Sequence, residues 1–589
     1  MKIIKFFCLL FLSNQFSFSL PSESNENNHF RNLQELSDDI IILHTNDVHC
    51  GIMENIGYDG LMLYKKEMMK KYKNVITVDV GDHIQGGTIG LLSKGEDIIT
   101  IMNQIGYDVA ILGNHEFDYG VDQLEVCRNK LNCDYICANY CLTKDKKPIY
   151  DPYKIVPAGN KKIAFIGVAT PQTLTRTFLH EILDEDNNMK YDFLTGNNGQ
   201  ELYTTIQKYI DEVKSQGADY VIILAHMGNG GDAQYEFTSD GLLANLEGVD
   251  AMLDGHTHLV YSQTSKDKNG KNIPLAQTGT KLNNIGVLKI ATNGVITSEL
   301  IQSVPTPDDK SNILNTSRGW VDKEMNEMLE AIVDLHSVEL NQIIGTVDFD
   351  MIINSEPDGS SKTQISREKE VSLGDLVADA IRDIGKGEIS MINAGSIRAD
   401  LFEGDITYQD VLDVLPFSAD IIVKNVPGKA ILDALELGMM HLPGKSSIFT
   451  QVSGITFDVN VNINSSVELD PSGMFLGVKG KRRVHNVMVG KKRLDLNKKY
   501  RVSFDNYIAG GGDGFTMFSP YEEIESTSNT DNQAFITYIK DKLNGKIPEE
   551  YRNSSNRIII QNFFTPFEVG SIIMNKFGLM LLLLAFLLF

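Results

Sequence analysis

Residues 40–49 (IIILHTNDVH) place a carboxylate and an imidazole shortly after an apolar run. The run from Ile40 to Leu43 is short and mostly β-branched, which is typical of a buried strand. Asp47 and His49 follow where such a strand would end. Because ligands gather at the carboxyl ends of strands in α/β sheets, this stretch predicts a strand that delivers both side chains to a site.

Four more segments before residue 306 follow the same design. Each is an apolar run that ends in residues able to bind a metal: 75–82 (VITVDVGD), 109–116 (VAILGNHE), 221–226 (VIILAH) and 251–258 (AMLDGHTH). Five such strand ends would converge on one patch. Imidazole and carboxylate ligands suit zinc, manganese and similar divalent ions, whereas an all-oxygen set would indicate magnesium or calcium. The sequence therefore predicts a metal centre, and two-metal hydrolysis would need one carboxylate to bridge ions about 3.5–4 Å apart.

Length and composition exclude several classes of protein. A chain of 589 residues is long enough for two large domains. With 42% hydrophobic and 22% charged residues, it has the profile of a folded soluble chain rather than a disordered one. The net charge is -24, and the densest basic runs, 479–483 and 491–493, are short. Capture of nucleic acid by a basic face is therefore not expected.

The order of strand-like and helix-like patterns predicts two α/β domains. Short β-rich runs alternate with helical stretches from residue 38 to 305, which is typical of a layered α/β domain. A proline-containing break follows, and apolar residues at helical spacing predict a helix over 318–341 within a linker of residues 306–342. A second α/β domain is expected over residues 343–562.

The two ends of the chain have the patterns of targeting segments. Residues 1–20 combine Lys2 and Lys5 with an apolar run and small residues, which is typical of a secretory signal. Residues 563–589 end in the apolar run 577–589, which is shorter than the roughly 20 residues of a spanning helix. We expect this segment to be a hydrophobic signal that is exchanged for a GPI anchor. A short transmembrane anchor, with Lys576 at the interface, is the alternative. The protein is thus expected at the extracellular face of the cell membrane.

Cysteines and glycosylation sequons fit an exported chain. Removal of the signal would leave five cysteines: Cys50, Cys127, Cys133, Cys137 and Cys141. They lack the CxxC pair of a zinc site, so in an oxidising compartment two disulfides and one unpaired thiol are expected, with the pairing left open. Sequons that suit a glycosylated surface begin at Asn315, Asn464 and Asn553.

The motifs of the first domain resemble those of the 5'-nucleotidase family in the calcineurin-like metallophosphoesterase superfamily, which also contains UDP-sugar hydrolases, 2',3'-cyclic phosphodiesterases and some apyrases. The resemblance covers about residues 40–562. It implies an α/β/β/α catalytic domain, a bridging helix and a C-terminal α/β nucleotide-binding domain. It rests on residues 44–49 (HTNDVH), 81–82 (GD), 113–118 (GNHEFD), 225–226 (AH) and 255–258 (GHTH).

The resemblance implies two divalent metal ions, with zinc expected and manganese or other first-row ions as alternatives. Asp82 would bridge the two ions. The first ion would be held by Asp47, His49 and His258, and the second by Asn114, His226 and His256.

The family's catalytic pair falls on His115 and Asp118. Asp118 would orient the imidazole of His115 and favour its protonated form. His115 would then stabilise the phosphoryl charge. The nucleophile would be a metal-activated water, so no covalent intermediate is implied. Glu116 is expected only to support the loop.

Three loops of the second domain resemble the family's nucleotide-binding domain: 393–398 (NAGSIR), 415–417 (LPF) and 506–515 (NYIAGGGDGF). By position, Phe417 and Tyr507 would stack on the base, which is worth about 1–3 kcal/mol per base. Tyr507 stands where close relatives often have Phe, so its hydroxyl can add a hydrogen bond. Asp513 would accept from a ribose hydroxyl. The base or phosphate side would be held by Asn393, Gly395 and Arg398, together with one cation just before residue 372, either Arg367 or Lys369.

The sequence therefore predicts a secreted or surface-anchored phosphohydrolase that removes phosphate from nucleoside 5'-monophosphates. The pair of aromatic residues favours a nucleotide over a generic phosphomonoester. Three alternatives stay open: a UDP-sugar or nucleoside diphosphate hydrolase, a 2',3'-cyclic phosphodiesterase with 3'-nucleotidase activity, and, from a different class, a surface binding protein on an inactive scaffold. The expected partners are a small nucleotide, the membrane through the anchor, and a second copy if the chain forms a homodimer.

Overall fold

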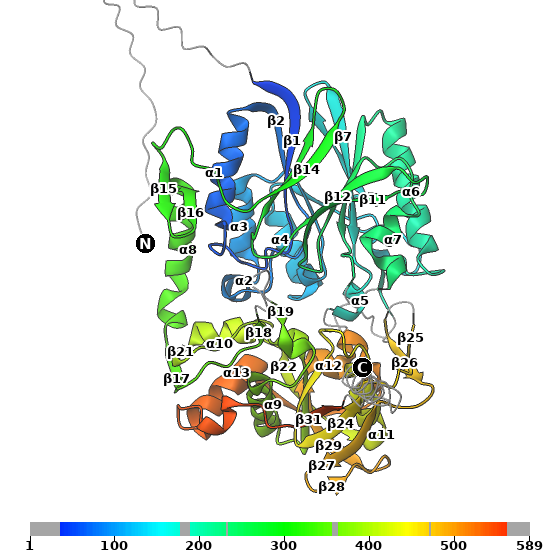
Figure 1. Ribbon diagram of the computed structural model, residues 1–589, viewed down its shortest axis with the longest axis vertical. Coiled ribbons are helices and arrows are strands. Elements are labelled where there is room, and N and C mark those ends of the chain that lie inside the picture. The colour runs from blue at the N-terminus through cyan, green and yellow to red at the C-terminus, as the bar shows by residue number, and fades with distance from the viewer. Residues whose placement is uncertain (1–35, 177–188, 231–233, 356–362, 471–472, 562–589) are drawn as a thin grey trace, which may run out of the picture. The chain divides into compact units, whose positions relative to one another are not determined.

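The computed structural model describes residues 36–176, 189–230, 234–355, 363–470 and 473–561. Within them the chain forms a mixed α/β protein with an N-terminal and a C-terminal domain (Figure 1). The predicted secretory signal and the apolar C-terminal run lie outside the described residues. In the part of the chain that the structure describes, no helix combines the length and the apolar character needed to cross a membrane.

The first sheet of the N-terminal domain has six strands in the order β14-β13-β1-β2-β3-β4. The strands β1 to β4 run parallel, whereas β13 is antiparallel to both β1 and β14. The bounds are β1 (Ser37–Thr45), β2 (Tyr72–Asp79), β3 (Val109–Ile111), β4 (Asp134–Ile136), β13 (Ile285–Ile290) and β14 (Ile296–Ile301).

The second sheet also has six strands, in the order β11-β12-β10-β9-β7-β6. Its four inner strands run parallel, and the edge strands β6 and β11 are antiparallel to their neighbours. The bounds are β6 (Tyr153–Ala158), β7 (Lys161–Ala169), β9 (Tyr220–His226), β10 (Ala251–Asp254), β11 (Val260–Lys266) and β12 (Asn272–Thr278).

The two sheets share an apolar core. Ile40 and Ile42 of β1 lie in this core with residues of β7 and β9. Ile41 and Leu43 belong instead to the core on the outer side of the first sheet. This alternation follows from the two-residue period of a strand. Because both faces are buried, the strands have the continuous apolar runs seen in the sequence.

Helices cover the outer side of each sheet, as Figure 1 shows for the N-terminal domain. The helices α1 (Gly57–Met69), α3 (Glu96–Ile105) and α4 (Val121–Lys130) contribute to the outer core of the first sheet. The helices α6 (Gln200–Ser215) and α7 (Ser239–Leu243) do the same for the second sheet. The predicted α/β/β/α layering is therefore confirmed.

A hairpin and a long helix connect the two domains. The strand β15 (Ile313–Thr316) pairs with β16 (Gly319–Asp322), and α8 (Lys323–Leu340) follows. The helix begins later than the predicted residue 318 because residues 319–322 are held in the hairpin. Asp322 then caps the helix, since its side chain accepts a hydrogen bond from the Met325 N–H at 3.0 Å.

The C-terminal domain is built on a five-stranded sheet, β23-β20-β29-β22-β30, and a four-stranded sheet, β28-β27-β24-β31. The first sheet contains β20 (Ile389–Asn393), β22 (Asp420–Pro427), β23 (Thr450–Ser453), β29 (Lys499–Asp505) and β30 (Glu523–Thr530). The second contains β24 (Ile455–Asn460), β27 (Val484–Val489), β28 (Lys492–Arg493) and β31 (Ile558–Gln561). The main helices are α9 (Ser372–Gly385), α11 (Gly428–Gly438) and α13 (Asp531–Thr537).

The topology of the five-stranded sheet gathers the three predicted nucleotide-binding loops. The strands β20 and β29 run parallel, and β22 is antiparallel to β29. The residues after β20, the residues after β29 and the residues before β22 therefore emerge at the same edge of the sheet. These are the residues of the 393–398, 506–515 and 415–417 loops.

The expectation of two disulfides is wrong. All five cysteines from Cys50 to Cys141 are buried free thiols. They pack as small side chains in the cores of the N-terminal domain. Several thiols already have oxygen partners of their own, since Cys50 contacts the His83 carbonyl and Cys127 contacts the Lys94 carbonyl, each at 3.6 Å. Each thiol is thus accommodated by its local surroundings.

Candidate functional site

Five strand ends of the N-terminal domain supply the predicted metal ligands, as the sequence indicates. The strands β1, β2 and β3 lead to ligands from the first sheet, and β9 and β10 lead to ligands from the second. Five of the seven predicted ligands have a positive backbone φ, between 46° and 82°. Residues other than glycine rarely adopt this backbone conformation, which costs free energy unless the surrounding structure holds it. The five are Asp47, His49, Asp82, His256 and His258.

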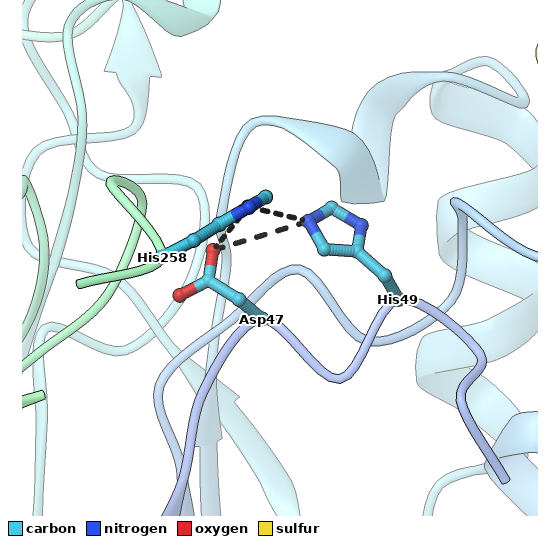
Figure 2. A group of neighbouring side chains, drawn as sticks. All are labelled: Asp47, His49 and His258. Atoms are coloured by element: carbon cyan, nitrogen blue, oxygen red, sulfur yellow. Dashed lines mark hydrogen bonds and ion pairs between the residues drawn. The ribbon is translucent and has the colours of Figure 1, made fainter. Parts of the chain in front are cut away.

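Asp47, His49 and His258 form the first group of possible metal ligands (Figure 2). The Asp47 Oδ1 atom lies 3.4 Å from His258 Nε2 and 4.0 Å from His49 Nε2, and the two Nε2 atoms are 3.0 Å apart. His49 Nδ1 lies 2.8 Å from the Gln85 carbonyl oxygen. That contact turns the Nε2 atom of His49 toward the group.

Asp82, His226 and His256 form the second group. The Asp82 Oδ2 atom lies 3.0 Å from His226 Nε2 and 3.8 Å from His49 Nε2, so one oxygen faces both groups. The other oxygen, Oδ1, accepts a hydrogen bond from the His115 N–H at 2.8 Å. The Asp82 carboxylate therefore lies between the two groups of possible metal ligands.

Two buried atoms test whether these residues fit a cation. Among the described residues, Asn114 Oδ1 has no hydrogen-bond partner, and His226 Nε2 faces only the Asp82 carboxylate at 3.0 Å, because its Nδ1 lies 2.7 Å from the Val80 carbonyl oxygen. A buried polar atom without a partner is costly, and both atoms carry a lone pair that can bind a metal. Together with the imidazole and carboxylate groups, they make a donor set that suits a divalent first-row ion. The residues present therefore fit a divalent metal centre.

His115 and Asp118 are in direct contact beside the metal-capable groups. His115 Nδ1 lies 2.6 Å from Asp118 Oδ2 on the short helical turn after β3. Burial by itself lowers the pKa of His115, but the carboxylates of Asp118 and Asp82 outweigh it, so the pKa lies above its ordinary value. The imidazole of His115 is therefore oriented by Asp118, and its raised pKa favours the protonated form.

One pocket is lined by residues of both domains and lies beside the metal-capable groups. Most of the predicted substrate-binding residues line it, together with Gln172, which belongs to none of the sequence motifs. Its walls include Asp82, Asn114, His115, Asp118, Gln172, His256, His258, Arg367, Asn393, Gly395, Arg398, Phe417, Tyr507 and Asp513.

Phe417 and Arg398 lie beside the His115 end of this pocket. The Phe417 ring is 5.7 Å from the His115 ring, measured between centroids. The Arg398 guanidinium lies 4.9 Å from the centre of the Phe417 ring, which is cation–π geometry. Arg398 Nε also donates to the Gly395 carbonyl oxygen at 2.6 Å. These contacts hold a planar cation and an aromatic face next to His115.

Asn393, Asp513 and Tyr507 line the same pocket and contact one another. Asn393 Nδ2 donates to Asp513 Oδ2 at 2.7 Å, and the Ser396 hydroxyl donates to Asn393 Oδ1 at 2.5 Å. The Tyr507 hydroxyl donates to the Thr175 carbonyl oxygen of the N-terminal domain at 2.7 Å. A loop of each domain is thus joined beside the pocket.

The structure distinguishes between the two cations expected near residue 372. Arg367 lines the pocket, at the end of the short turn Ile365–Arg367. Lys369 is exposed, and its carbonyl oxygen accepts from Gln451 Nε2 at 3.0 Å. The chain leaves the pocket after Arg367, so Arg367 rather than Lys369 is placed to meet a ligand.

Gln172 was missed because a lone glutamine carries no motif. Its Oε1 atom lies 2.6 Å from His256 Nε2. The signal was nevertheless present, because β7 ends at Ala169, just before Gln172, and belongs to the same parallel sheet as β9 and β10. A sixth strand end could therefore have been added to the five.

Comparisons with known proteins agree with this arrangement. Residues 40–260 match the calcineurin-like phosphoesterase family, and residues 344–520 match the 5'-nucleotidase C-terminal domain. The chain is 25% identical to a 5'-nucleotidase of Homo sapiens over 567 residues, which covers 85% of this chain and 88% of the relative. It is 24% identical to a trifunctional nucleotide phosphoesterase protein of Bacillus subtilis over 548 residues, covering 86% of this chain but only 34% of that longer protein.

A solved structure shares the fold. The 5'-nucleotidase precursor from Thermus thermophilus matches with a TM-score of 0.71 and 23% identity, over 89% of this chain and 100% of the other. The two family matches fall on the N-terminal and C-terminal parts of the fold, and the metal-capable groups lie in the first of them. The chain therefore belongs to the 5'-nucleotidase family of the calcineurin-like metallophosphoesterases, a family of metal-dependent hydrolases.

Proposed function

We propose that the protein is a two-metal phosphohydrolase that removes phosphate from nucleoside 5'-monophosphates. One observation carries this proposal: a single pocket is lined by His115 and Asn114 of the N-terminal domain, which form its first wall, and by Phe417, Tyr507 and Asp513 of the C-terminal domain, which form its second wall. The first wall suits a phosphate and the second suits a nucleoside. A generic phosphomonoester would leave the second wall unused.

Bound divalent ions would supply a nucleophilic water and neutralise phosphate charge. Asp47, His49 and His258 would hold one ion. Asn114, His226 and His256 would hold the other, and Asp82 would contact both. Zinc suits this donor set, and manganese is the alternative.

His115 and Arg398 would act on the phosphate. Because Asp118 occupies Nδ1 of His115, the remaining N–H at Nε2 is available to donate to a phosphoryl oxygen and to stabilise the charge that develops there. The planar guanidinium of Arg398 would bind phosphate oxygens with more than one N–H donor.

The second wall would select a nucleoside. Phe417 and Tyr507 would stack on the base, and Asp513 would accept from a ribose hydroxyl. Binding energy from these remote contacts would hold the phosphate in register with the metal-capable groups, which raises turnover only for substrates that carry a nucleoside.

A substrate panel tests this proposal. The full chain should be stripped with a chelator, reloaded with zinc or manganese, and assayed for phosphate release from AMP, UMP, ADP, UDP-glucose, 2',3'-cyclic AMP and p-nitrophenyl phosphate. We expect AMP and UMP to give the highest kcat/KM. Preference for UDP-glucose or for the cyclic nucleotide would overturn the substrate class. Equal kcat/KM for AMP and p-nitrophenyl phosphate would show that the second wall does not contribute to substrate selection.

We further propose that the enzyme acts at the outer face of the cell membrane through a GPI anchor. The basic and apolar residues of 1–20 and the apolar run 577–589 support this location. Phosphatidylinositol-specific phospholipase C should release activity from intact cells. Detection of residues 577–589 in the mature membrane-bound protein would establish a peptide anchor instead.

A further inference from the structure

A buried carboxylate lies behind the metal-capable loops of the first sheet. Glu116 has no exposed surface, and both of its oxygens accept backbone N–H groups. Oε2 accepts from Asp82 N at 2.8 Å and from Gly113 N at 2.6 Å. Oε1 accepts from His83 N at 2.8 Å. One side chain therefore joins the loop after β2, which carries Asp82, to the loop after β3, which carries Asn114.

A second buried carboxylate has the same relation to the second sheet. Asp254 also has no exposed surface. Its Oδ1 atom accepts from Gly228 N at 2.9 Å and from Gly255 N at 2.9 Å. It thus joins the loop after β9, which follows His226, to the loop after β10, which carries His256. Its Oδ2 atom accepts from the Tyr261 hydroxyl at 2.5 Å.

These contacts matter because the joined loops are strained. Asp82 has φ of 58° and His256 has φ of 82°. A strained backbone persists only where the surroundings hold it, and a buried N–H without an acceptor is costly. Each carboxylate supplies acceptors for the turns that carry these residues.

We propose that Glu116 and Asp254 are positioning residues that hold the metal ligands in place before any ion binds, one for each sheet. This inference rests on the proposed function, because it takes Asp82, Asn114, His226 and His256 as ligands. It assigns Glu116 and Asp254 no contact with metal or substrate. They act through the backbone of the ligand loops, and groups of this kind typically change metal affinity by about 10- to 100-fold.

The two carboxylates should respond differently to their amide isosteres. Both oxygens of Glu116 accept backbone N–H groups, so Glu116→Gln must turn an NH2 group against an N–H donor whichever way the amide lies. Asp254→Asn can keep its carbonyl oxygen on the two loops and donate its NH2 group to the Tyr261 hydroxyl, and it loses only the longer hydrogen bond, 3.4 Å, that Oδ2 accepts from Gln277 Nε2. We therefore expect Glu116→Gln and Asp254→Ala to weaken metal binding. The metal affinity of Asp254→Asn should lie much closer to that of the wild type.

Metal affinity of the apoprotein and the visible spectrum of the cobalt-loaded protein test this inference, because both report the ligands without turnover. We expect Glu116→Gln and Asp254→Ala to bind zinc roughly 10- to 100-fold more weakly, in competition with a chelator, and to have altered cobalt absorption. Asp322→Ala is the matched control: it removes a buried carboxylate that caps α8. It should lower the melting temperature while leaving zinc affinity and the cobalt spectrum unchanged.

The outcomes separate this inference from the proposed function. A wild-type apoprotein that binds no divalent ion would overturn the proposed function. Wild-type zinc affinity and cobalt spectrum in Glu116→Gln would overturn the inference and leave the function standing. If a variant does not fold, hydrogen exchange on the wild-type apoprotein tests whether the ligand loops are held without metal. The amides of Asp82, His83 and Gly113 should stay protected after metal removal. Rapid exchange of these amides would contradict the inference.

Discussion

The hydroxyl of Tyr507 lies 2.9 Å from Oδ1 of Asp513, and the backbone N–H of Asp513 lies 3.1 Å from the same hydroxyl. The aromatic ring expected to stack on a base is thus tied to the carboxylate expected to bind the ribose. Because a phenylalanine could stack but could not make these contacts, the tyrosine gives this wall of the pocket a polar restraint. The ring and the hydroxyl can therefore be tested separately.

Phe417→Ala and Tyr507→Ala should each lower kcat/KM for AMP by roughly 5- to 150-fold, the range that corresponds to losing one base-stacking contact. Neither should change hydrolysis of p-nitrophenyl phosphate by more than a small factor. Tyr507→Phe is the matched variant, since it keeps the ring and should show a smaller loss that isolates the hydroxyl. Equal losses on both substrates would show that these rings support the fold rather than a nucleoside.

Asp82→Asn should abolish phosphate release. The amide can still accept the His115 N–H, so the loop keeps its contact, but the negative charge that faces both ligand groups is removed. Metal content measured by mass spectrometry should fall together with activity. Full metal content with near-normal turnover would refute the bridging assignment.

His115→Ala should separate charge stabilisation from metal binding. We expect kcat to fall by roughly 10²- to 10⁴-fold, the range for losing a positioned acid–base or electrostatic group. Metal stoichiometry should be unchanged, because His115 is assigned to the substrate and not to an ion. Loss of one bound ion in this variant would make His115 a ligand instead.

Asp505→Asn should flatten the pH dependence of stability. Burial, with a smaller contribution from Asp513, raises the pKa of Asp505 from 3.8 to about 7. Between these values the unfolded chain has lost a proton that the folded chain keeps, so stability falls as pH rises, by about 1.4 kcal/mol per pH unit for this group. Asparagine can still accept from the Ile508 N–H and does not titrate. Urea unfolding at pH 4, 5.5 and 7 should show that the free energy of unfolding of the variant increases relative to that of the wild type as pH rises. The same pH dependence of this free energy in both proteins would contradict the raised pKa of Asp505.

Several features of the site could be predicted because they are local in sequence. The apolar run before Asp47 and the polar residues after it lie within ten positions, and the spacing of His115 and Asp118 fits one helical turn. Other features depend on pairs that are far apart. Glu116 contacts Asp82 across 34 positions, and Tyr507 reaches Thr175 across 332. The motif at 113–118 predicts that Glu116 supports its own loop, but no periodicity or motif shows that it reaches the loop of Asp82, or that Asp254 reaches the loop after His226.

The sequence by itself determined the α/β class, the layered N-terminal domain and the residues able to bind metal, because strands buried on both faces must be apolar and ligands must follow where those strands end. Only the tertiary structure decided that the cysteines stay free, that Arg367 rather than Lys369 meets the pocket, and that Gln172 touches His256. Those outcomes depend on how side chains from distant segments pack against one another, and packing is settled by the whole fold rather than by any one stretch of chain.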